Sequence, residues 1–280
     1  MPERSEPYPG RAGALRVLVV ANQKGGVGKT TTAINLGTAL AAVGEKVLLI
    51  DSDPQGNAST GLGVGRALRK NTLYDVLMGE KALLEAVVAT SVPGLHLTPS
   101  DPDLSGIELE LGQLAGRSFK LRDALQPLRG GREYTYVLID CPPSLNLLTV
   151  NAMAAADAVL VPLQCEFFAL EGLSQLMRTI ELVRGSLNPA LELQGVVLTM
   201  YDRRNSLSEQ VASDVRSHLG EAVYQTLIPR NVRVSEAPSF GKPVLVYDLK
   251  CAGSQAYLKL AREVVLRERR RRSARQLEES

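Results

Sequence analysis

NQKGGVGKTTT, residues 22–32, decides the fold of this 280-residue chain. It lies between LRVLVVAN (15–22), a β-branched run typical of a buried parallel strand, and TTTAINLGTALAAVG (30–44). The apolar spacing of that second segment and its closing Gly44 predict a helix. KVLLID (46–51) then reads as a second buried strand. Strand, loop, helix and strand in this order predict a right-handed parallel βαβ unit.

The glycine-rich loop has the residue types that a triphosphate site requires. Gly25, Gly26 and Gly28 let the backbone come close to phosphate oxygens and aim its N–H groups at them. The helix that begins near Lys29 adds its positive dipole end. We expect Lys29 to reach the β and γ phosphates and the Thr30 hydroxyl to ligate Mg²⁺. The loop therefore predicts an ATP and Mg²⁺ site.

The alternation of strands and helices continues to the end of the chain. Further buried strands are expected at 135–140, 158–163 and 193–200, with helices near 145–155, 169–184, 206–219 and 253–270. Between residues 60 and 130 the pattern is mixed, with short helices at LYDVLMG (73–79) and IELELGQLAG (107–116) and a strand at GLHLTPS (94–100). The pattern predicts an α/β fold of the P-loop NTPase (SIMIBI-like) class: a doubly wound, mostly parallel sheet with helices on both faces.

Composition suggests one globular domain between two polar ends. We expect a flexible leader at 1–13, a single ATPase domain at 14–266 and an Arg-rich C-terminal tail at 267–280. The tail has six arginines and three glutamates, a balance of +3, so the rest sums to −1 because the chain carries +2. DNA binding by the body would therefore need a local basic patch. A solvated tail and a functional one both remain open.

Carboxylates follow two of the expected strands, where open α/β sheets bind ligands. Asp51 and Asp53 lie in DSDPQGN (51–57), directly after KVLLI, and Asp140 lies in VLIDCPPS, directly after TYVLI. A carboxylate at Asp140 can hold Mg²⁺ through water, and Asp53 would then orient or deprotonate the attacking water. Cys141 is interpreted as a small buried residue beside the site.

The loop departs from the usual P-loop pattern in an informative way. GxxxxGK[ST] requires a glycine at position 23, where this chain has Gln23. KGGVGKT, from Lys24, resembles the deviant P-loop of the ParA/MinD superfamily. In that family the signature lysine, here Lys24, reaches across a dimer interface to the nucleotide of the partner. The resemblance implies ATP contacts from Lys24, Gly25, Gly26, Val27, Gly28, Lys29, Thr30 and Thr31.

Further blocks, spread from about residue 15 to 260, are similar to ParA/Soj proteins: VLLIDSDPQGNASTGLG, LIDCPPSL and IPRNVRVSEAPSFGKPV. The resemblance, not the spacing, assigns catalysis to Asp53, beside Lys24 and Lys29, and leaves Asp51 as a supporting residue. Metal contacts are expected from Thr30, with Asp53 and Asp140 through water. Pro229 and Asn231 would lie near the adenine, and Arg233 would project to the surface.

The resemblance also implies a function. Its elements are an ATP-bound homodimer, slow ATP hydrolysis stimulated by a ParB (Spo0J-like) partner, and binding to double-stranded DNA without sequence preference. Such a protein segregates a chromosome or plasmid in the cytoplasm, associated with the nucleoid. The expected DNA-binding residues are Arg204 and Arg233, with Arg203, Arg230, Lys242 and Lys250 as neighbours.

Three related classes remain as alternatives. A MinD-like positioning ATPase would need a lipid-inserting C-terminal helix, for which Leu258, Leu260, Val264, Val265 and Leu266 are the apolar candidates. An iron–sulfur reductase would use cluster cysteines such as Cys141 and Cys165. A plasmid ParA with an N-terminal helix-turn-helix would need more than the 14 residues before the first strand. The three cysteines form neither a disulfide framework nor a CxxC pair, and no signal peptide or membrane span is expected.

Overall fold

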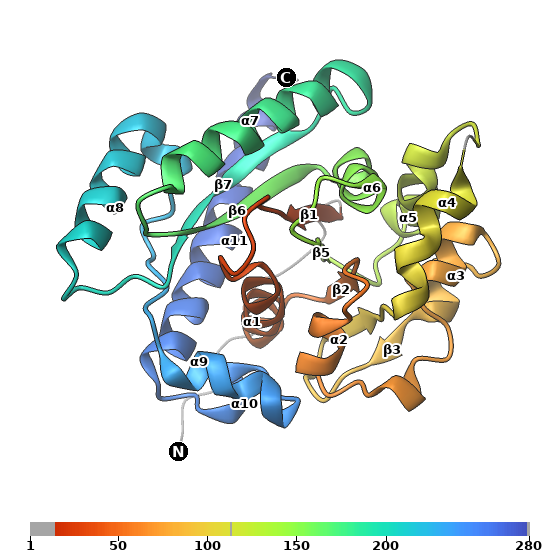
Figure 1. Ribbon diagram of the computed structural model, residues 1–280, viewed down its shortest axis with the longest axis horizontal. Coiled ribbons are helices and arrows are strands. Elements are labelled where there is room, and N and C mark those ends of the chain that lie inside the picture. The colour runs from red at the N-terminus through yellow and green to blue at the C-terminus, as the bar shows by residue number, and fades with distance from the viewer. Residues whose placement is uncertain (1–14, 113, 279–280) are drawn as a thin grey trace.

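The computed structural model describes residues 15–112 and 114–278, so the expected leader lies outside the described residues. A seven-stranded sheet runs through the centre of the described chain in the order β3-β4-β2-β5-β1-β6-β7 (Figure 1). All neighbouring strands pair in parallel except β3, which is antiparallel to β4. The expected mostly parallel sheet is confirmed. The strands are β1 Arg16–Val20, β2 Val47–Asp51, β3 Val88–Ala89, β4 Leu95–Thr98, β5 Tyr136–Asp140, β6 Ala158–Gln164 and β7 Glu192–Thr199.

Helices cover both faces of the sheet (Figure 1). Their bounds are α1 Lys29–Ala42, α2 Asn57–Gly61, α3 Leu73–Met78, α4 Ile107–Leu111, α5 Lys120–Arg129, α6 Leu147–Ala155, α7 Ala169–Ser186, α8 Ser206–Leu219, α9 Val232–Glu236, α10 Val244–Tyr247 and α11 Ala252–Glu278. Helix α5 was not predicted; it lies at the end of the region of mixed pattern and contains Pro127. It forms nonetheless, since Leu121, Leu125 and Leu128 bury one face against the core.

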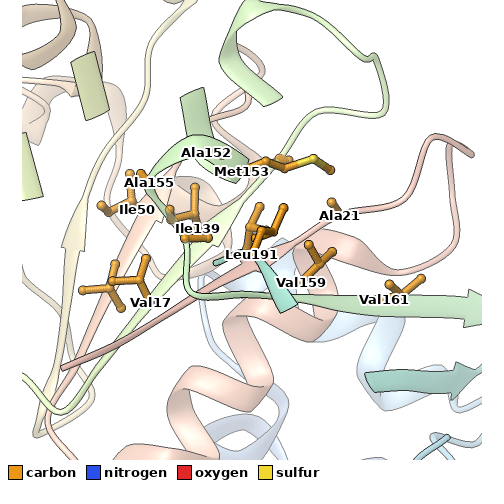
Figure 2. Close-up of a cluster of buried hydrophobic side chains, with 14 of the residues drawn as sticks. Val17, Ala21, Ile50, Ile139, Ala152, Met153, Ala155, Val159, Val161 and Leu191 are labelled. Carbon is orange, nitrogen blue, oxygen red and sulfur yellow. The ribbon is translucent and has the colours of Figure 1, made fainter. Parts of the chain in front are cut away.

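The core consists of two layers, one on each side of the sheet. Val17 and Val19 of β1 point into one layer, while Leu18 and Val20 point into the other, as the period of two in a strand requires. Figure 2 shows the first layer, where strand residues such as Val17, Ile139 and Val159 meet Ala152 and Met153 of α6. Because all five residues of β1, β2 and β5 are buried, these strands are continuous apolar runs rather than alternating ones.

Strand register brings the predicted carboxylates to one edge of the sheet. Asp140, the last residue of β5, is the register partner of both Val20 and Asp51, the last residues of β1 and β2. The phosphate loop leaves β1 at this same edge. Ligands of open α/β sheets bind outside the carboxyl ends of the strands, and the fold therefore gathers the expected site residues there.

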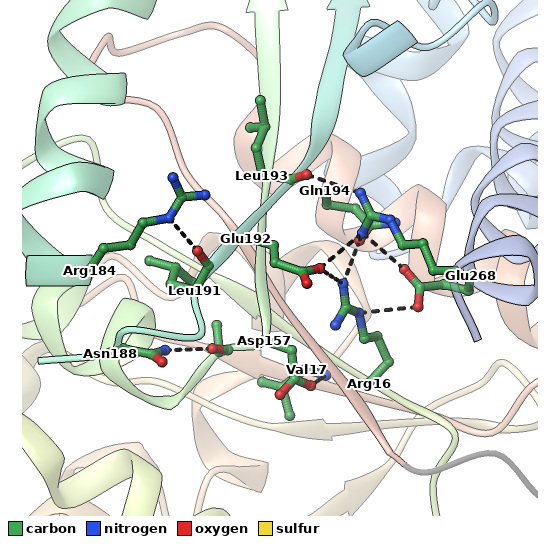
Figure 3. Close-up of polar contacts among 12 residues, drawn as sticks. Arg16, Val17, Asp157, Arg184, Asn188, Leu191, Glu192, Leu193, Gln194 and Glu268 are labelled. Atoms are coloured by element: carbon green, nitrogen blue, oxygen red, sulfur yellow. Dashed lines mark hydrogen bonds and ion pairs between the residues drawn. The ribbon is translucent and has the colours of Figure 1, made fainter. Parts of the chain in front are cut away.

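The opposite edge of the sheet is closed by an ion-pair network. Arg16 at the start of β1 contacts Glu192 at 3.1 Å and Glu268 of α11 at 3.2 Å (Figure 3). Arg271, one turn further along α11, donates to Gln194 at 2.7 Å and to the Leu193 carbonyl oxygen at 3.1 Å. Both charges of Arg16 and Glu268 are almost fully buried, so the network ties the last helix to the first and last strands.

Helix α11 joins the C-terminal part of the expected domain to the expected Arg-rich tail. It continues without a break from residue 252 to 278, across the expected boundary at residue 266. Figure 1 shows it alongside α1, and its Leu260 and Val264 are completely buried there. These two candidates for lipid insertion therefore pack on the body instead. Among the described helices, none combines the length and apolar character needed to cross a membrane.

Candidate nucleotide-binding site

The conformation of the phosphate loop is fixed by its glycines and by hydrogen bonds within the chain. Gly26 and Gly28 have φ angles of 77° and 88°, in the left-handed region that glycine adopts without strain. The Asn22 side chain braces the start of the loop, accepting from the Lys24 N–H at 3.0 Å and donating to the Pro162 carbonyl at 2.8 Å. Helix α1 follows directly and no side chain caps its first turn. Its free N–H groups therefore face an anion-binding position.

The two lysines of the loop have separate partners in the chain. Lys29 is buried, and its ammonium donates to the Lys24 carbonyl oxygen at 2.8 Å. Burial lowers the pKa of Lys29, against the charges of Asp140, Cys141 and Asp53, which raise it. The Lys24 ammonium forms an ion pair with Glu166, in the connection between β6 and α7. Neither lysine extends freely into solvent.

Asp140 is the most unusual group in the site. It is completely buried, and neither of its carboxylate oxygens accepts a hydrogen bond of ordinary geometry from the described residues, although the Thr30 hydroxyl lies close enough to stabilise the charged form. Burial raises the pKa of Asp140 well above its usual range, as do the charges of Asp51 and Asp53, while Thr30 and Lys29 lower it. A buried carboxylate with two unsatisfied oxygens is costly unless a cation or its water completes the set. The residues present fit Mg²⁺.

Asp51 and Asp53 have different environments. Asp51 is fully buried and accepts from the Ser59 N–H at 2.8 Å and from the Ser59 hydroxyl at 2.7 Å. Burial raises the pKa of Asp51 to about 6, although the Ser59 hydrogen bonds lower it. Asp53 retains slight exposure, and among the described residues only the Gln55 N–H donates to its carboxylate, at 2.9 Å. Asp51 is therefore held by hydrogen bonds within the chain more fully than Asp53, and the roles expected of the two aspartates stay predictions.

The end of β7 forms the second wall of the loop. The Thr199 hydroxyl donates to the Val27 carbonyl at 2.8 Å, and a Cβ atom on Gly28 would lie 3.8 Å from the Met200 methyl group. Met200 has a φ of 51°, the only positive value among the described non-glycine residues, and such strained positions cluster at functional sites. The next residue, Tyr201, pairs with Pro229. This bridge holds the Pro229 segment alongside the end of β7, and the adenine contacts expected of Pro229 and Asn231 stay predictions.

Comparison with known proteins identifies the family. A family model described as an AAA domain matches residues 15–193, more than half of the chain. A protein named chromosome partitioning protein ParA, from Caulobacter vibrioides, is 77% identical over 94% of this chain and 98% of its own. The chain belongs to the ParA/Soj family of chromosome-partitioning proteins. Another member, the sporulation initiation inhibitor protein Soj of Bacillus subtilis, is 48% identical over 89% of this chain and 98% of its own.

Solved structures agree with the ParA/Soj fold. A crystal structure described as cobyrinic acid a,c-diamide synthase from Mycobacterium smegmatis is 40% identical, with a TM-score of 0.78 over 90% of this chain and 94% of that one. It was solved with a bound ATP analogue and magnesium. The family and the P-loop fold that were predicted from the deviant phosphate loop are therefore confirmed.

Of the two main arginines that the ParA/Soj resemblance assigns to DNA binding, Arg204 lies in the connection between β7 and α8, and Arg233 lies in the short helix α9. The Arg230 N–H donates to the Tyr201 carbonyl at 3.0 Å, which holds the segment before α9 against the connection that carries Arg204. Both arginines have acidic partners: Arg204 is bidentate on Asp202 at 3.0 Å, and Arg233 contacts Glu236 at 2.5 Å and Asp248 at 3.5 Å. The expected neighbours Arg203, Arg230, Lys242 and Lys250 are exposed.

Several site residues escaped sequence reasoning. Ser59 and Ser100 hold Asp51 and the turn of Asp53; Ser59 lies in the block that contains DSDPQGN but was given no role there, and Ser100 comes from a segment without a recognised motif. Glu166 lies two residues beyond β6, and only its charge beside a strand end could have drawn attention to it. Cys141 is buried as expected, and burial raises the pKa of its thiol well above the usual range. Cys165 is buried, and its N–H donates to the Thr199 carbonyl oxygen. Among the described residues it is a free cysteine without a disulfide partner.

Proposed function

We propose that this chain is an ATP-driven dimerisation switch that binds double-stranded DNA without sequence preference. It would segregate a chromosome or plasmid together with a ParB-type partner, in the cytoplasm and associated with the nucleoid. The observation that carries the proposal is the fully buried Asp140 carboxylate, which has no hydrogen bond of ordinary geometry and lies close to Thr30 and Lys29 of the phosphate loop. The names of the ParA and Soj relatives and the magnesium-bound ATP analogue in the related crystal structure support it.

In this proposal the chain's residues divide the work on ATP. The loop N–H groups and Lys29 bind the phosphates, and Pro229 and Asn231 flank the adenine. Mg²⁺, held by Thr30 directly and by Asp140 and Asp53 through water, would neutralise charge on the phosphate oxygens. Asp53 orients the attacking water or accepts its proton. Without a charge donated from outside, hydrolysis is slow, on the order of 10⁻³ s⁻¹ or less, until the ParB-type partner binds.

Dimerisation follows from Lys24. Its ammonium would leave Glu166 and reach the phosphates of the nucleotide in a second copy of the chain. The ion pair with Glu166 is more than one-third exposed at the lysine, and such pairs contribute only about 0–1 kcal/mol. A triphosphate offers more negative charge and more acceptor oxygens than one carboxylate. ATP can therefore compete for Lys24, which makes the dimer depend on the bound nucleotide.

DNA binding would use the surface that two copies share. The acidic partners of Arg204 and Arg233 are partly exposed, so phosphates of DNA can displace them at little cost. Pairing of two subunits doubles the number of arginines that face one duplex, which links DNA affinity to ATP. No base-reading motif accompanies these arginines, so the proposal includes no sequence specificity.

Co-sedimentation with DNA tests the proposal. The native chain is compared with ATP, with ADP and without nucleotide, and Arg233→Ala serves as the variant. Retention is expected with ATP only, and it should be largely lost in Arg233→Ala. Equal retention of the native chain with ATP, with ADP and without nucleotide would contradict the proposal that ATP controls DNA binding.

A further inference from the structure

The turn that carries Asp53 is held by a side chain from outside any recognised motif. Arg69 lies after the short 3-10 helix at 66–68 and directs its guanidinium back over the turn between β2 and α2. Its Nη2 donates to the Gly56 carbonyl at 3.3 Å and to the Thr60 hydroxyl at 2.8 Å. Its Nη1 donates to the Ser100 carbonyl at 2.9 Å, and its Nε donates to the Val64 carbonyl at 3.0 Å. One guanidinium thus joins four separate points of the chain.

Ser100 holds the other end of the same turn. This residue is completely buried, and its hydroxyl donates to the Asp53 carbonyl at 2.7 Å. The Gly56 N–H donates to the same carbonyl at 2.9 Å, which closes the turn. The Ser100 N–H donates to the Ser59 hydroxyl at 3.2 Å, and that hydroxyl in turn donates to Asp51. Ser100 therefore links both aspartates.

The fit of the guanidinium over the turn depends on glycine at position 56. Gly56 has a φ of 63°, and a Cβ atom there would lie 2.3 Å from Arg69 Nη1 and 3.3 Å from the Ser100 carbonyl oxygen. Any side chain at this position would push the guanidinium away. The turn, Arg69 and Ser100 are therefore joined in one hydrogen-bonded network. Arg69 is 13 positions from Gly56 and 31 positions from Ser100 in sequence.

We propose that Arg69 is a positioning residue for ATP hydrolysis, which acts with Ser100 to fix the turn Asp53–Gly56 and thereby the Asp53 carboxylate. The inference rests on the proposed role of Asp53. A planar fork with five donors can hold several acceptors in a fixed arrangement, whereas a lysine ammonium cannot. Misplacement of a reacting group by about 1 Å can slow a reaction by about 100-fold. Arg69 does not contact the phosphate loop in any described hydrogen bond, so ATP binding should not need it.

Single-turnover hydrolysis of saturating ATP with Mg²⁺ tests this inference, alongside the ATP-dependent dimer measured by light scattering. Arg69→Gln and Arg69→Lys should both hydrolyse ATP about 10–100-fold more slowly, with the ATP dimer and apparent ATP affinity retained. If Arg69→Lys does not restore the rate of ATP hydrolysis, the geometry of the guanidinium matters and its positive charge alone is not enough. Arg184→Gln is the matched control, because Arg184 also donates to a backbone carbonyl, that of Leu191, but lies on α7.

Ser100→Ala makes the test independent of how Arg69 variants fold. It removes one buried hydroxyl and its bond to the Asp53 carbonyl, and the same slowing of hydrolysis is expected. A rate of ATP hydrolysis equal to that of the native chain in Ser100→Ala or in Arg69→Gln would overturn the inference. Equal loss of ATP binding and hydrolysis in Arg69→Gln would overturn it too, since the residue would then support the fold alone. If the native chain neither binds ATP nor dimerises, the proposed function fails instead.

Discussion

The Lys29 ammonium donates a hydrogen bond of 2.8 Å to the backbone carbonyl oxygen of Lys24. Lys29, which we expect to bind the phosphates, is therefore hydrogen-bonded to Lys24, which we expect to reach the nucleotide of a second subunit. Lys24 itself is paired with Glu166, so each lysine has an internal partner that a nucleotide must replace. Because these partners are a carbonyl and a partly exposed carboxylate, the loop is shaped for phosphate without being blocked.

Lys29→Ala should weaken ATP binding by about 10–100-fold, because a hydrogen bond to a charged group contributes about 1.5–3 kcal/mol. Titration with a fluorescent ATP analogue measures the affinity. Lys81→Ala is the control, since Lys81 is exposed and forms an ion pair with Glu85 at 3.9 Å. Equal affinities for the native chain and Lys29→Ala would contradict the assignment of this lysine.

Lys24→Ala should bind ADP as the native chain does but remain monomeric with ATP. Its ammonium is paired with Glu166 in the single chain, so loss of the side chain should affect assembly more than nucleotide binding. Size-exclusion chromatography with ATP and Mg²⁺ gives the readout. An unchanged ATP dimer would show that Lys24 has no part in it.

Stability should depend on pH through Asp51. Its pKa in the folded chain is about 6 against an ordinary 3.8, so the folded state binds more protons than the unfolded state between these values. The free energy of unfolding therefore falls as pH rises through this window, and Asp140 acts in the same direction. Thermal denaturation without nucleotide should show a smaller fall for Asp51→Asn than for the native chain. Parallel curves for the two proteins would refute this.

DNA affinity in the presence of ATP should fall steeply with salt. Two arginines in each subunit, Arg204 and Arg233, give about four phosphate contacts in a dimer and a log–log slope of about −3.6. Arg233→Ala should reduce that slope to about −1.8. A salt titration of DNA binding measures both slopes, and an unchanged slope in the variant would exclude Arg233 from the contact.

Arg271→Ala should destabilise the fold by about 1–3 kcal/mol, because its loss removes the hydrogen bonds to the Gln194 side chain and to the Leu193 carbonyl oxygen. Arg269→Ala is the matched control on the same helix, where the side chain is exposed and a change within about 0.5 kcal/mol is expected. Urea denaturation compares the two. Equal effects would mean that the network at the start of β1 and β7 contributes nothing.

Local patterns predicted the elements that bury continuous apolar runs. The strands expected at 135–140 and 158–163 match β5 and β6 within one residue at each end, and Gly44 ends the turn after α1. The phosphate loop could be placed residue by residue, because its chemistry requires glycine and lysine at fixed spacings. Two-residue strand β3 could not be predicted, since pairing with β4 alone defines it.

The parts of the site that sequence reasoning missed depend on contacts between distant segments. Ser100 meets Asp53 across 47 positions, and Arg69 meets Ser100 across 31. Both residues come from the region between 60 and 130, where helices and strands are short and periodicity is mixed. Hydrogen bonds of this kind leave no periodic signal, whereas the carboxylates at strand ends could be predicted from fold class alone.

The mass of the native chain in solution, measured by light scattering, tests the account most directly. We predict a dimer with Mg²⁺ and a non-hydrolysable ATP analogue, and a monomer with ADP or without nucleotide. A monomer in all three conditions would contradict the claim that ATP joins two copies of this chain.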